Sequence, residues 1–136
     1  MGFKAHYARQ GSVGWQIDSW DVANQLLSYL SPEKRAYATF TRTDGSYVQC
    51  AGSKSRLTVE VRVIDVRGGF EHYVLGRGAP VGRETKIDCS IGPIAVDVSQ
   101  VLDLRAARRI IRVFVEDGTL HPNFVASDVT AKFADP

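Results

Sequence analysis

Residues 103–118 carry the longest uninterrupted helical pattern in this chain. Asp103 can accept hydrogen bonds from the first free amides of a helix, and Gly118 stands where helices commonly end. Between these two positions, apolar residues recur at spacings of three and four, as they do along one buried face of a helix. The sequence therefore predicts an amphipathic helix that packs against other elements. Its buried face comprises Leu104, Ala107, Ile110, Ile111, Phe114 and Val115.

Arginine dominates the opposite face of this helix. Arginine forms forked contacts with carboxylates and is enriched at protein interfaces, whereas lysine would serve solubility better. The helix also ends in Glu116 and Asp117, although carboxylates are unfavourable at the negative end of the helix dipole. We interpret this face either as a solvated surface or as a binding surface for an acidic protein. The arginines are Arg105, Arg108, Arg109 and Arg112.

Strand and turn signals fill most of the chain before this helix. Residues 13–17 predict a short strand, and the amphipathic segment after it predicts a first helix that ends before Pro32. Asp44 and Gly45 lie between two strand-like runs and predict a tight hairpin, because both residue types tolerate positive φ. Residues 56–66 alternate between apolar and polar types, which predicts a long strand with one buried face. Further strands are predicted at residues 70–75, 85–91, 94–98 and 124–130.

This order of elements predicts an α+β fold. We expect a mainly antiparallel, curved sheet with the two amphipathic helices packed on one of its faces. Residues 13–136 should form a single α+β domain, and residues 1–12, which are polar and contain glycine, should form a flexible N-terminal tail. No apolar run approaches the roughly 20 residues that span a bilayer, and the first residues lack the apolar core of a secretory signal. The sequence therefore predicts a cytoplasmic protein without a membrane partner.

Charge and cysteine content narrow the classes of partner and cofactor. A formal net charge of +2 is too small to indicate nucleic-acid binding by itself. Cys50 and Cys89 are most simply reduced, and no cysteine or histidine pair has the spacing of zinc ligands. The glycine-rich loop at residues 76–83 contains Arg77 and Arg83 but matches no nucleotide-binding motif, which favours a plain loop over a phosphate cradle. We predict no metal and no cofactor.

Catalysis by a nucleophile would need an activated side chain, a base and a site that stabilises the oxyanion. The available pieces are the two cysteines with His72 and His121, and no local motif joins them. Both cysteines fall in predicted strands, where a buried thiol is usually inert. We therefore predict no catalytic residues and no enzymatic activity. The alternative is a small hydrolase or transferase that uses Cys89 or His72.

Two stretches of the chain resemble segments of a known protein family. One is residues 14–27, GWQIDSWDVANQLL, in which a short strand and an acidic cap lead into a leucine-containing helix. The other comprises residues 93–102, PIAVDVSQVL, the helix that follows, and residues 114–122, FVEDGTLHP. In this layout the chain resembles the small α/β immunity proteins of bacterial polymorphic and contact-dependent toxin systems. The resemblance is to the group that includes inhibitors of secreted DNA deaminases.

The resemblance implies a rigid binding protein with no chemistry of its own. Such an immunity protein, or antitoxin, binds the catalytic face of a cognate secreted toxin domain and keeps the substrate out. A third interpretation is a nucleic-acid-binding adaptor that uses the arginine-rich helix, although the interleaved aromatic residues that stack bases are missing. The oligomeric state stays open. The expected toxin-binding residues are Arg105, Arg108, Arg112, Glu116, Asp117, Arg77 and Arg83.

Overall fold

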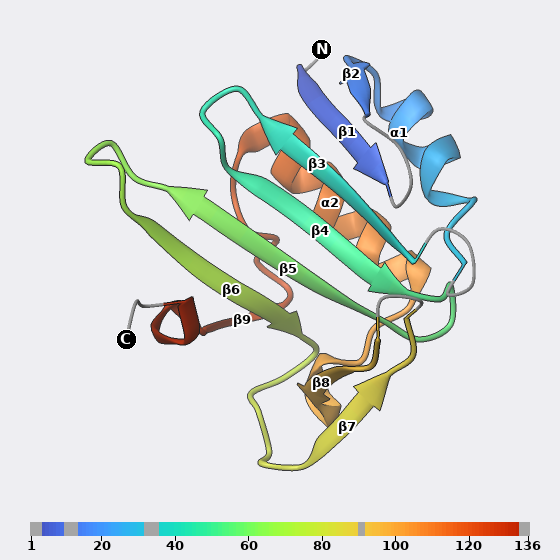
Figure 1. The fold of residues 1–136 in the computed structure, drawn as a ribbon, viewed down its shortest axis with the longest axis vertical. Helices are drawn as coiled ribbons and strands as arrows, with labels where there is room; N and C mark the ends of the chain where they lie inside the picture. The colour runs from blue at the N-terminus through green and yellow to red at the C-terminus, as the bar shows by residue number, and fades with distance from the viewer. Residues whose placement is uncertain (1–3, 10–13, 32–35, 90–91, 134–136) are drawn as a thin grey trace.

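The main sheet of the protein has seven strands (Figure 1). Its strands are β1 (Ala5–Arg9), β2 (Trp15–Ile17), β3 (Tyr37–Arg42), β4 (Tyr47–Gly52), β5 (Leu57–Ile64), β6 (Phe70–Gly76) and β9 (Val125–Asp128). They lie in the order β2-β1-β3-β4-β5-β6-β9, and every neighbouring pair is antiparallel. The computed structural model describes residues 4–9, 14–31, 36–89 and 92–133.

Two helices and a small second sheet complete the fold. The remaining elements are α1 (Trp20–Leu27), α2 (Leu104–Asp117), the antiparallel pair β7 (Glu84–Ile87) and β8 (Ile94–Asp97), and the 3-10 helices η1 (Val98–Gln100) and η2 (Thr130–Phe133). Figure 1 shows α2 behind the central strands and α1 near the β1–β2 end of the sheet. The predicted α+β class with a mainly antiparallel sheet is confirmed. Neither of the described helices is long and apolar enough to cross a bilayer.

The apolar sides of α1 and α2 share one core with the main sheet. This core includes Leu27 from α1, Phe114 from α2 and Phe40 from β3. The long strand predicted at residues 56–66 is β5, and Val59, one of the residues predicted to point inward, is fully buried. Alternation of apolar and polar residues thus correctly identified the face of β5 that meets the helices.

The first strand corrects the prediction of a flexible tail over residues 1–12. Residues 5–9 form β1, which lies between β2 and β3 and pairs with both. Ala5 and Tyr7 point into the core and are buried. Only two inward residues mark this strand, so its alternation is too short to stand out, and its neighbour β3 is distant in sequence. Residues 1–3 and 10–12 lie outside the described part of the chain.

Both predicted ends of α2 are confirmed. The Asp103 carboxylate accepts a hydrogen bond from the Ala106 amide at 2.9 Å. Gly118 adopts the left-handed conformation with a φ of 74°, which glycine takes without strain. Ile110 and Ile111 are fully buried, as the spacing predicts. The helix is therefore a fixed platform for the residues on its outer face.

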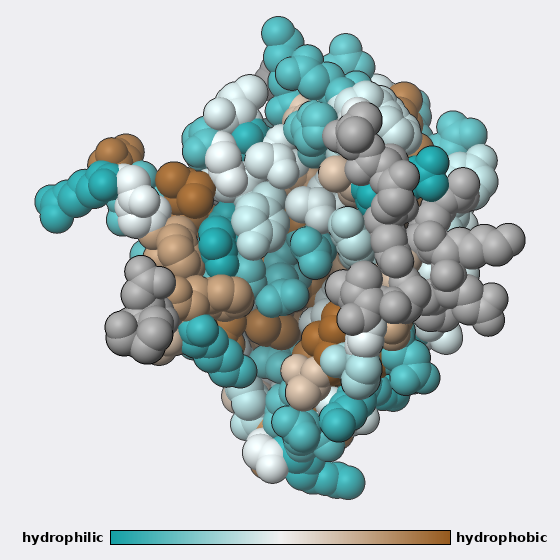
Figure 2. Space-filling view, in the orientation of Figure 1, coloured by the Kyte–Doolittle hydropathy of each residue, from teal (hydrophilic) through white to brown (hydrophobic). Residues whose placement is uncertain are grey.

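The other face of the main sheet carries polar and aromatic side chains. Glu60 and Arg62 of β5 point to this side, in agreement with the predicted alternation, and His72 of β6 lies opposite Arg62. Figure 2 shows hydrophilic side chains across the middle of the same face. At its β6 side, η2 brings Phe133 against His72, with ring centroids 4.5 Å apart. The sheet thus separates an apolar, helix-covered side from a polar one.

Candidate partner-binding surface on the second helix

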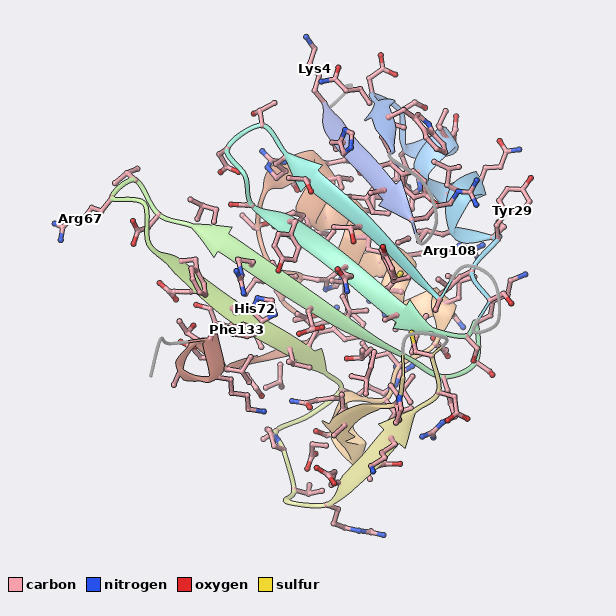
Figure 3. All side chains as sticks on the ribbon, viewed as in Figure 1. Lys4, Tyr29, Arg67, His72, Arg108 and Phe133 are labelled. Carbon is pink, nitrogen blue, oxygen red and sulfur yellow. The ribbon has the colours of Figure 1, made fainter. Side chains whose placement is uncertain are left out.

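The arginines of α2 lie on the surface that the helix turns away from the core. Arg105, Arg109 and Arg112 are exposed, whereas Arg108 is half-buried. Figure 3 shows Arg108 beside the end of α1, close to Tyr29. The surface is therefore formed by both helices, and the arginines on it have different surroundings.

Arg108 joins the two helices. Its Nη2 donates to the Ser28 hydroxyl at 3.4 Å, and that hydroxyl donates to the Asn24 carbonyl at 3.3 Å. The Nε atom of Arg108 is buried and has no hydrogen-bond partner. Much of this side chain is therefore committed to the contact between α2 and α1, which leaves a smaller part of it for a partner.

Arg112 is exposed but held in place. Its Nε donates to the Glu116 carboxylate at 2.7 Å, one helical turn away. Its guanidinium carbon also lies 5.5 Å from the centroid of the Trp20 ring on α1. An exposed ion pair of this type contributes little to stability, but together with the ring it gives the guanidinium group a preferred direction. The structure thus brings together two predicted site residues, Arg112 and Glu116.

The loop residue Arg77 lies beside the start of α2. Its Nη2 is 3.5 Å from the Asp103 carboxylate. Next to this pair is a hollow of about 190 Å³, lined by residues that include Arg105 and Arg109. Two predicted site residues, Arg77 and Arg105, are therefore near neighbours although they come from different segments.

The remaining loop arginine has a different environment. The backbone amide of Arg83 donates to the Asp97 carboxylate at 3.1 Å, and its carbonyl accepts from the Val98 amide at 2.8 Å. Its side chain is exposed and does not line the hollow beside α2. The structure thus groups Arg83 with the small sheet rather than with the helical surface.

The loop before β7 cradles a carboxylate of the chain itself. Successive amides of Val81, Gly82 and Arg83 donate to Asp97 at 2.9–3.1 Å, and Ser99 donates to it through its amide and hydroxyl. The hydrogen bond from the Ser99 hydroxyl, followed by those from backbone amides, holds the pKa of Asp97 well below its ordinary value of 3.8. The phosphate cradle considered for this loop is thus an anion cradle that Asp97 already fills.

Replacing Asp97 with asparagine should make the free energy of unfolding less sensitive to a fall in pH. The depressed pKa means that Asp97 stabilises the folded state above the ordinary carboxyl pKa of about 4, and that this contribution is lost as pH falls through the lower folded-state value. The variant should therefore be less stable than the parent at pH 7, and the difference should shrink below about pH 4. Urea unfolding of the variant and the parent at pH 7 and below about pH 4 measures the difference in their free energies of unfolding. Asp88→Asn is the control, and an identical pH response in the two variants would refute the assignment.

The acidic end of α2 is compensated within the chain. Nη1 of Arg42, on β3, donates to the carbonyls of Phe114 at 3.0 Å and Val115 at 2.8 Å. A cation at these last carbonyls balances the helix dipole where Glu116 and Asp117 stand. The inference that these two carboxylates require an external partner is therefore weakened, although both are exposed.

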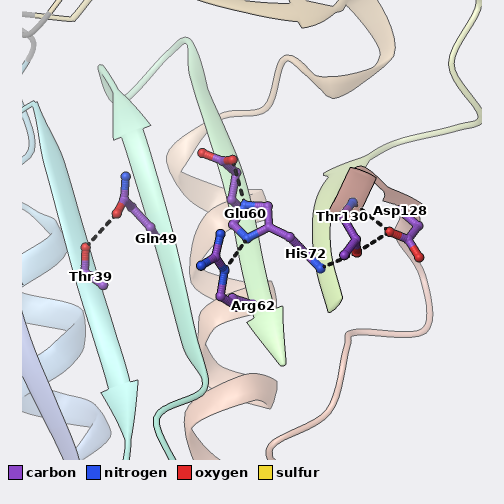
Figure 4. A network of polar contacts seen from close by, with 7 residues as sticks. All are labelled: Thr39, Gln49, Glu60, Arg62, His72, Asp128 and Thr130. Carbon is purple, nitrogen blue, oxygen red and sulfur yellow. Dashed lines mark hydrogen bonds and ion pairs between the residues drawn. The ribbon is translucent and has the colours of Figure 1, made fainter. Parts of the chain in front are cut away.

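His72 belongs to a buried polar network on the open sheet face (Figure 4). Nε of Arg62 donates to Nδ1 of His72 at 3.1 Å, and Nε2 of His72 lies 2.9 Å from the Glu60 carboxylate. Because an arginine Nε–H can only donate, Nδ1 must accept, which places the ring proton on Nε2 toward Glu60. The guanidinium carbon of Arg62 lies 3.9 Å from the centroid of the Phe70 ring and 4.7 Å from the centroid of the Phe133 ring. Both nitrogens of His72 are thus engaged in holding adjacent elements.

Neither cysteine lies with His72. Cys50 is fully buried, and its burial raises the pKa of the thiol to about 12. Cys89 follows β7, and its Sγ lies 4.0 Å from the carbonyl of Ala36, just before β3. His72 pairs with Arg62 and points to the open face of the sheet, whereas Cys50 belongs to the core on the other face. Within the described residues, neither cysteine therefore contacts His72, and the alternative of an enzyme that uses Cys89 or His72 stays a prediction.

Sequence reasoning missed the residues that hold the arginines. Trp20 and Phe124 contact Arg112 and Arg109, and Arg42 stabilises the end of the helix. The spacing of Arg109 already placed it on the arginine face, so it could have been included in the predicted site. The aromatic contacts join distant segments and leave no local signal. Within the described residues, no group of three or more histidine, cysteine or acidic side chains could hold a metal ion.

Comparisons with known proteins assign the chain to no family. No model of a known protein family matches it, and no curated protein is significantly similar to it.

Proposed function

We propose that this chain is an immunity protein that binds a secreted bacterial toxin domain and occludes its active site. The observation that carries the proposal is the set of ordered arginines on α2. Arg112 is held by Trp20 and Glu116, and Arg109 lies 5.5 Å from the centroid of the Phe124 ring. Side chains fixed before binding lose less conformational freedom in a complex, which favours affinity.

An aromatic hollow on the other side of α1 extends this surface. Its volume is about 300 Å³, and Trp15, Leu26 and Tyr29 are among the residues that line it. The side chains of Trp15 and Tyr29 are well exposed, at 41% and 51%. Tryptophan, tyrosine and arginine are the residue types that contribute most binding energy at protein interfaces. A partner that spans α1 would contact both the aromatic hollow and the arginines.

The proposed mechanism is occlusion by a rigid surface. Ile110, Ile111 and Phe114 anchor α2 in the core, so that its outer face keeps its shape in the free protein. A toxin domain would bind this face through an acidic region next to its own active site. No bond is made or broken, and inhibition lasts as long as the one-to-one complex.

The test first identifies a toxin-like reading frame next to the gene for this chain, and then measures the affinity of the chain for the encoded toxin domain by isothermal titration calorimetry. We expect one-to-one binding that the combined change Arg105→Glu and Arg112→Glu weakens at least tenfold, because both reversed charges would face an acidic partner. Arg67→Glu is the matched control. Figure 3 shows Arg67 at the far tip of the turn between β5 and β6, away from α2, so this change should leave affinity intact.

Two results would contradict the proposal in different ways. If the folded chain does not bind the toxin domain, the proposed function fails. If it binds but the double variant keeps full affinity, the interface lies on another face. Tight binding to generic duplex DNA with a steep salt dependence would instead favour the nucleic-acid adaptor.

A further inference from the structure

Three arginines surround a small hollow at the start of α2. It has a volume of about 190 Å³ and is lined by Arg77, Asp103, Arg105, Ala106 and Arg109. Arg77 follows β6, whereas the other four residues belong to α2 or to its N-cap. Two distant segments thus contribute three arginine residues to the lining of one hollow.

The hollow holds more positive than negative charge. Asp103 supplies its only carboxylate, which already accepts from the Ala106 amide and lies 3.5 Å from Arg77. Within the described part of the chain, neither Arg105 nor Arg109 forms an ion pair. With three arginines and one aspartate, the residues that line the hollow carry two net positive charges. Such a site attracts an anion.

The groups free to bind an anion are the arginine side chains. Most of the first amides of α2 have partners: the Leu104 amide donates to the Lys54 carbonyl at 2.7 Å and the Ala107 amide to the Asp103 carbonyl at 3.0 Å. The Ala106 amide is taken by the Asp103 carboxylate. An additional anion would therefore bind to guanidinium groups, whose forked N–H donors match the two oxygens of a carboxylate.

Arg109 is positioned by an aromatic pair. It lies 5.5 Å from the centroid of the Phe124 ring, which packs edge-on against His121 at 5.1 Å. Desolvation, followed by the nearby charge of Arg109, lowers the pKa of His121. The lowered pKa favours the neutral imidazole, which adds no competing charge. Arg109, which helps to line the hollow, thus also contacts the Phe124 ring.

We propose that this hollow binds one aspartate or glutamate side chain from the surface of the toxin domain. The identity of the partner rests on the proposed function, whereas the carboxylate chemistry rests on the hollow itself. Its volume of about 190 Å³ lies below the roughly 300–1,000 Å³ of pockets for small molecules, so a single side chain fits better than a nucleotide. The net charge of +2 is also small for a protein that binds a polyanion.

The test on the free chain uses acetate as the probe. In the ¹⁵N-labelled chain, sodium acetate should shift the Nε–Hε NMR signals of Arg77, Arg105 and Arg109, and sodium chloride at the same ionic strength should not. Arg67 is the internal control, since it lies in the turn between β5 and β6 and does not line the hollow. The combined change Arg105→Gln and Arg109→Gln should abolish the acetate shift at Arg77, while Arg67→Gln should preserve it.

Three outcomes on the free chain would overturn the carboxylate site. The first is an equal acetate shift at all arginines, and the second is an Arg77 shift that survives in the double glutamine variant. The third is binding of inorganic phosphate more than tenfold tighter than acetate, which would assign the hollow to phosphate. The NMR spectrum of each variant also shows whether the chain is folded.

The second part of the test uses the toxin domain. Arg105→Gln should weaken the complex about tenfold, which corresponds to the loss of one charge-assisted contact of roughly 1.4 kcal/mol. The charge reversal Arg105→Glu should weaken the complex further. Replacing the contacted carboxylate residue of the toxin with lysine should then restore binding of the Arg105→Glu variant. If acetate binds but the toxin domain does not, the proposed function fails and the carboxylate site stands. If the toxin domain binds and Arg105→Gln has no effect, the role of the hollow in the complex fails.

Discussion

Replacing Phe114 with alanine should lower the free energy of unfolding by about 3 to 5 kcal/mol. The Phe114 side chain is fully buried in the core that α2 shares with the main sheet. Its removal would leave a cavity that the surrounding strands and helices fill only in part. Urea denaturation followed by circular dichroism measures the change. This is the largest stability effect that we expect from truncating a residue of α2.

Arg105→Ala is the matched control for Phe114→Ala. Arg105 is exposed on the same helix, and alanine favours helix formation slightly more than arginine. Its replacement should therefore change stability by no more than about 0.5 kcal/mol. If Phe114→Ala also costs less than about 1 kcal/mol, α2 does not pack on the sheet as described, and its arginines are not held by a rigid platform.

Gly52→Ala should lower the free energy of unfolding by roughly 3 kcal/mol or more, the sum of backbone strain and steric conflict. Gly52 ends β4 with a φ of 130°, which side chains rarely allow. An added Cβ would lie 2.4 Å from the Arg56 carbonyl oxygen and 2.7 Å from Cγ2 of Ile87. The strand end, the following turn and β7 would all have to move. Urea denaturation again measures the loss.

Gly68→Ala separates the two causes of that loss. Gly68 also has a positive φ, of 87°, but an added Cβ would meet no atom within 4 Å. It should therefore cost only the backbone strain, about 1 to 2 kcal/mol. A similar loss of unfolding free energy in both variants would mean that the close contacts around Gly52 do not contribute to it.

Local patterns predicted the elements whose signals lie within a few residues. The caps of α2 at Asp103 and Gly118, the alternation along β5 and the hairpin at Asp44 each depend on neighbours in sequence. These signals fixed the fold class and the two faces of α2. They also placed Arg105 and Arg112 together on the outer face.

Contacts between distant segments account for what the patterns missed. β1 is defined by its pairing with β3, and the support of α2 by Arg42 links residues 72 and 73 positions apart. The Asp97 carboxylate likewise meets loop amides that precede it by 14 to 16 positions. No rule of residue spacing predicts contacts between segments so far apart in sequence. The hollow shared by Arg77 and Arg109 is unpredictable from sequence for the same reason.

The strand order of the main sheet has a consequence for the chain as the ribosome makes it. β1 and β2 can pair first, after which β3, β4, β5 and β6 each add to the edge left by an earlier strand. The helix that covers the apolar side of those strands, Leu104–Asp117, is translated only after all six. Before that point only α1 can cover part of this face, so the nascent chain exposes much of its apolar sheet surface until α2 leaves the exit tunnel, and during that interval chaperones have the most to bind.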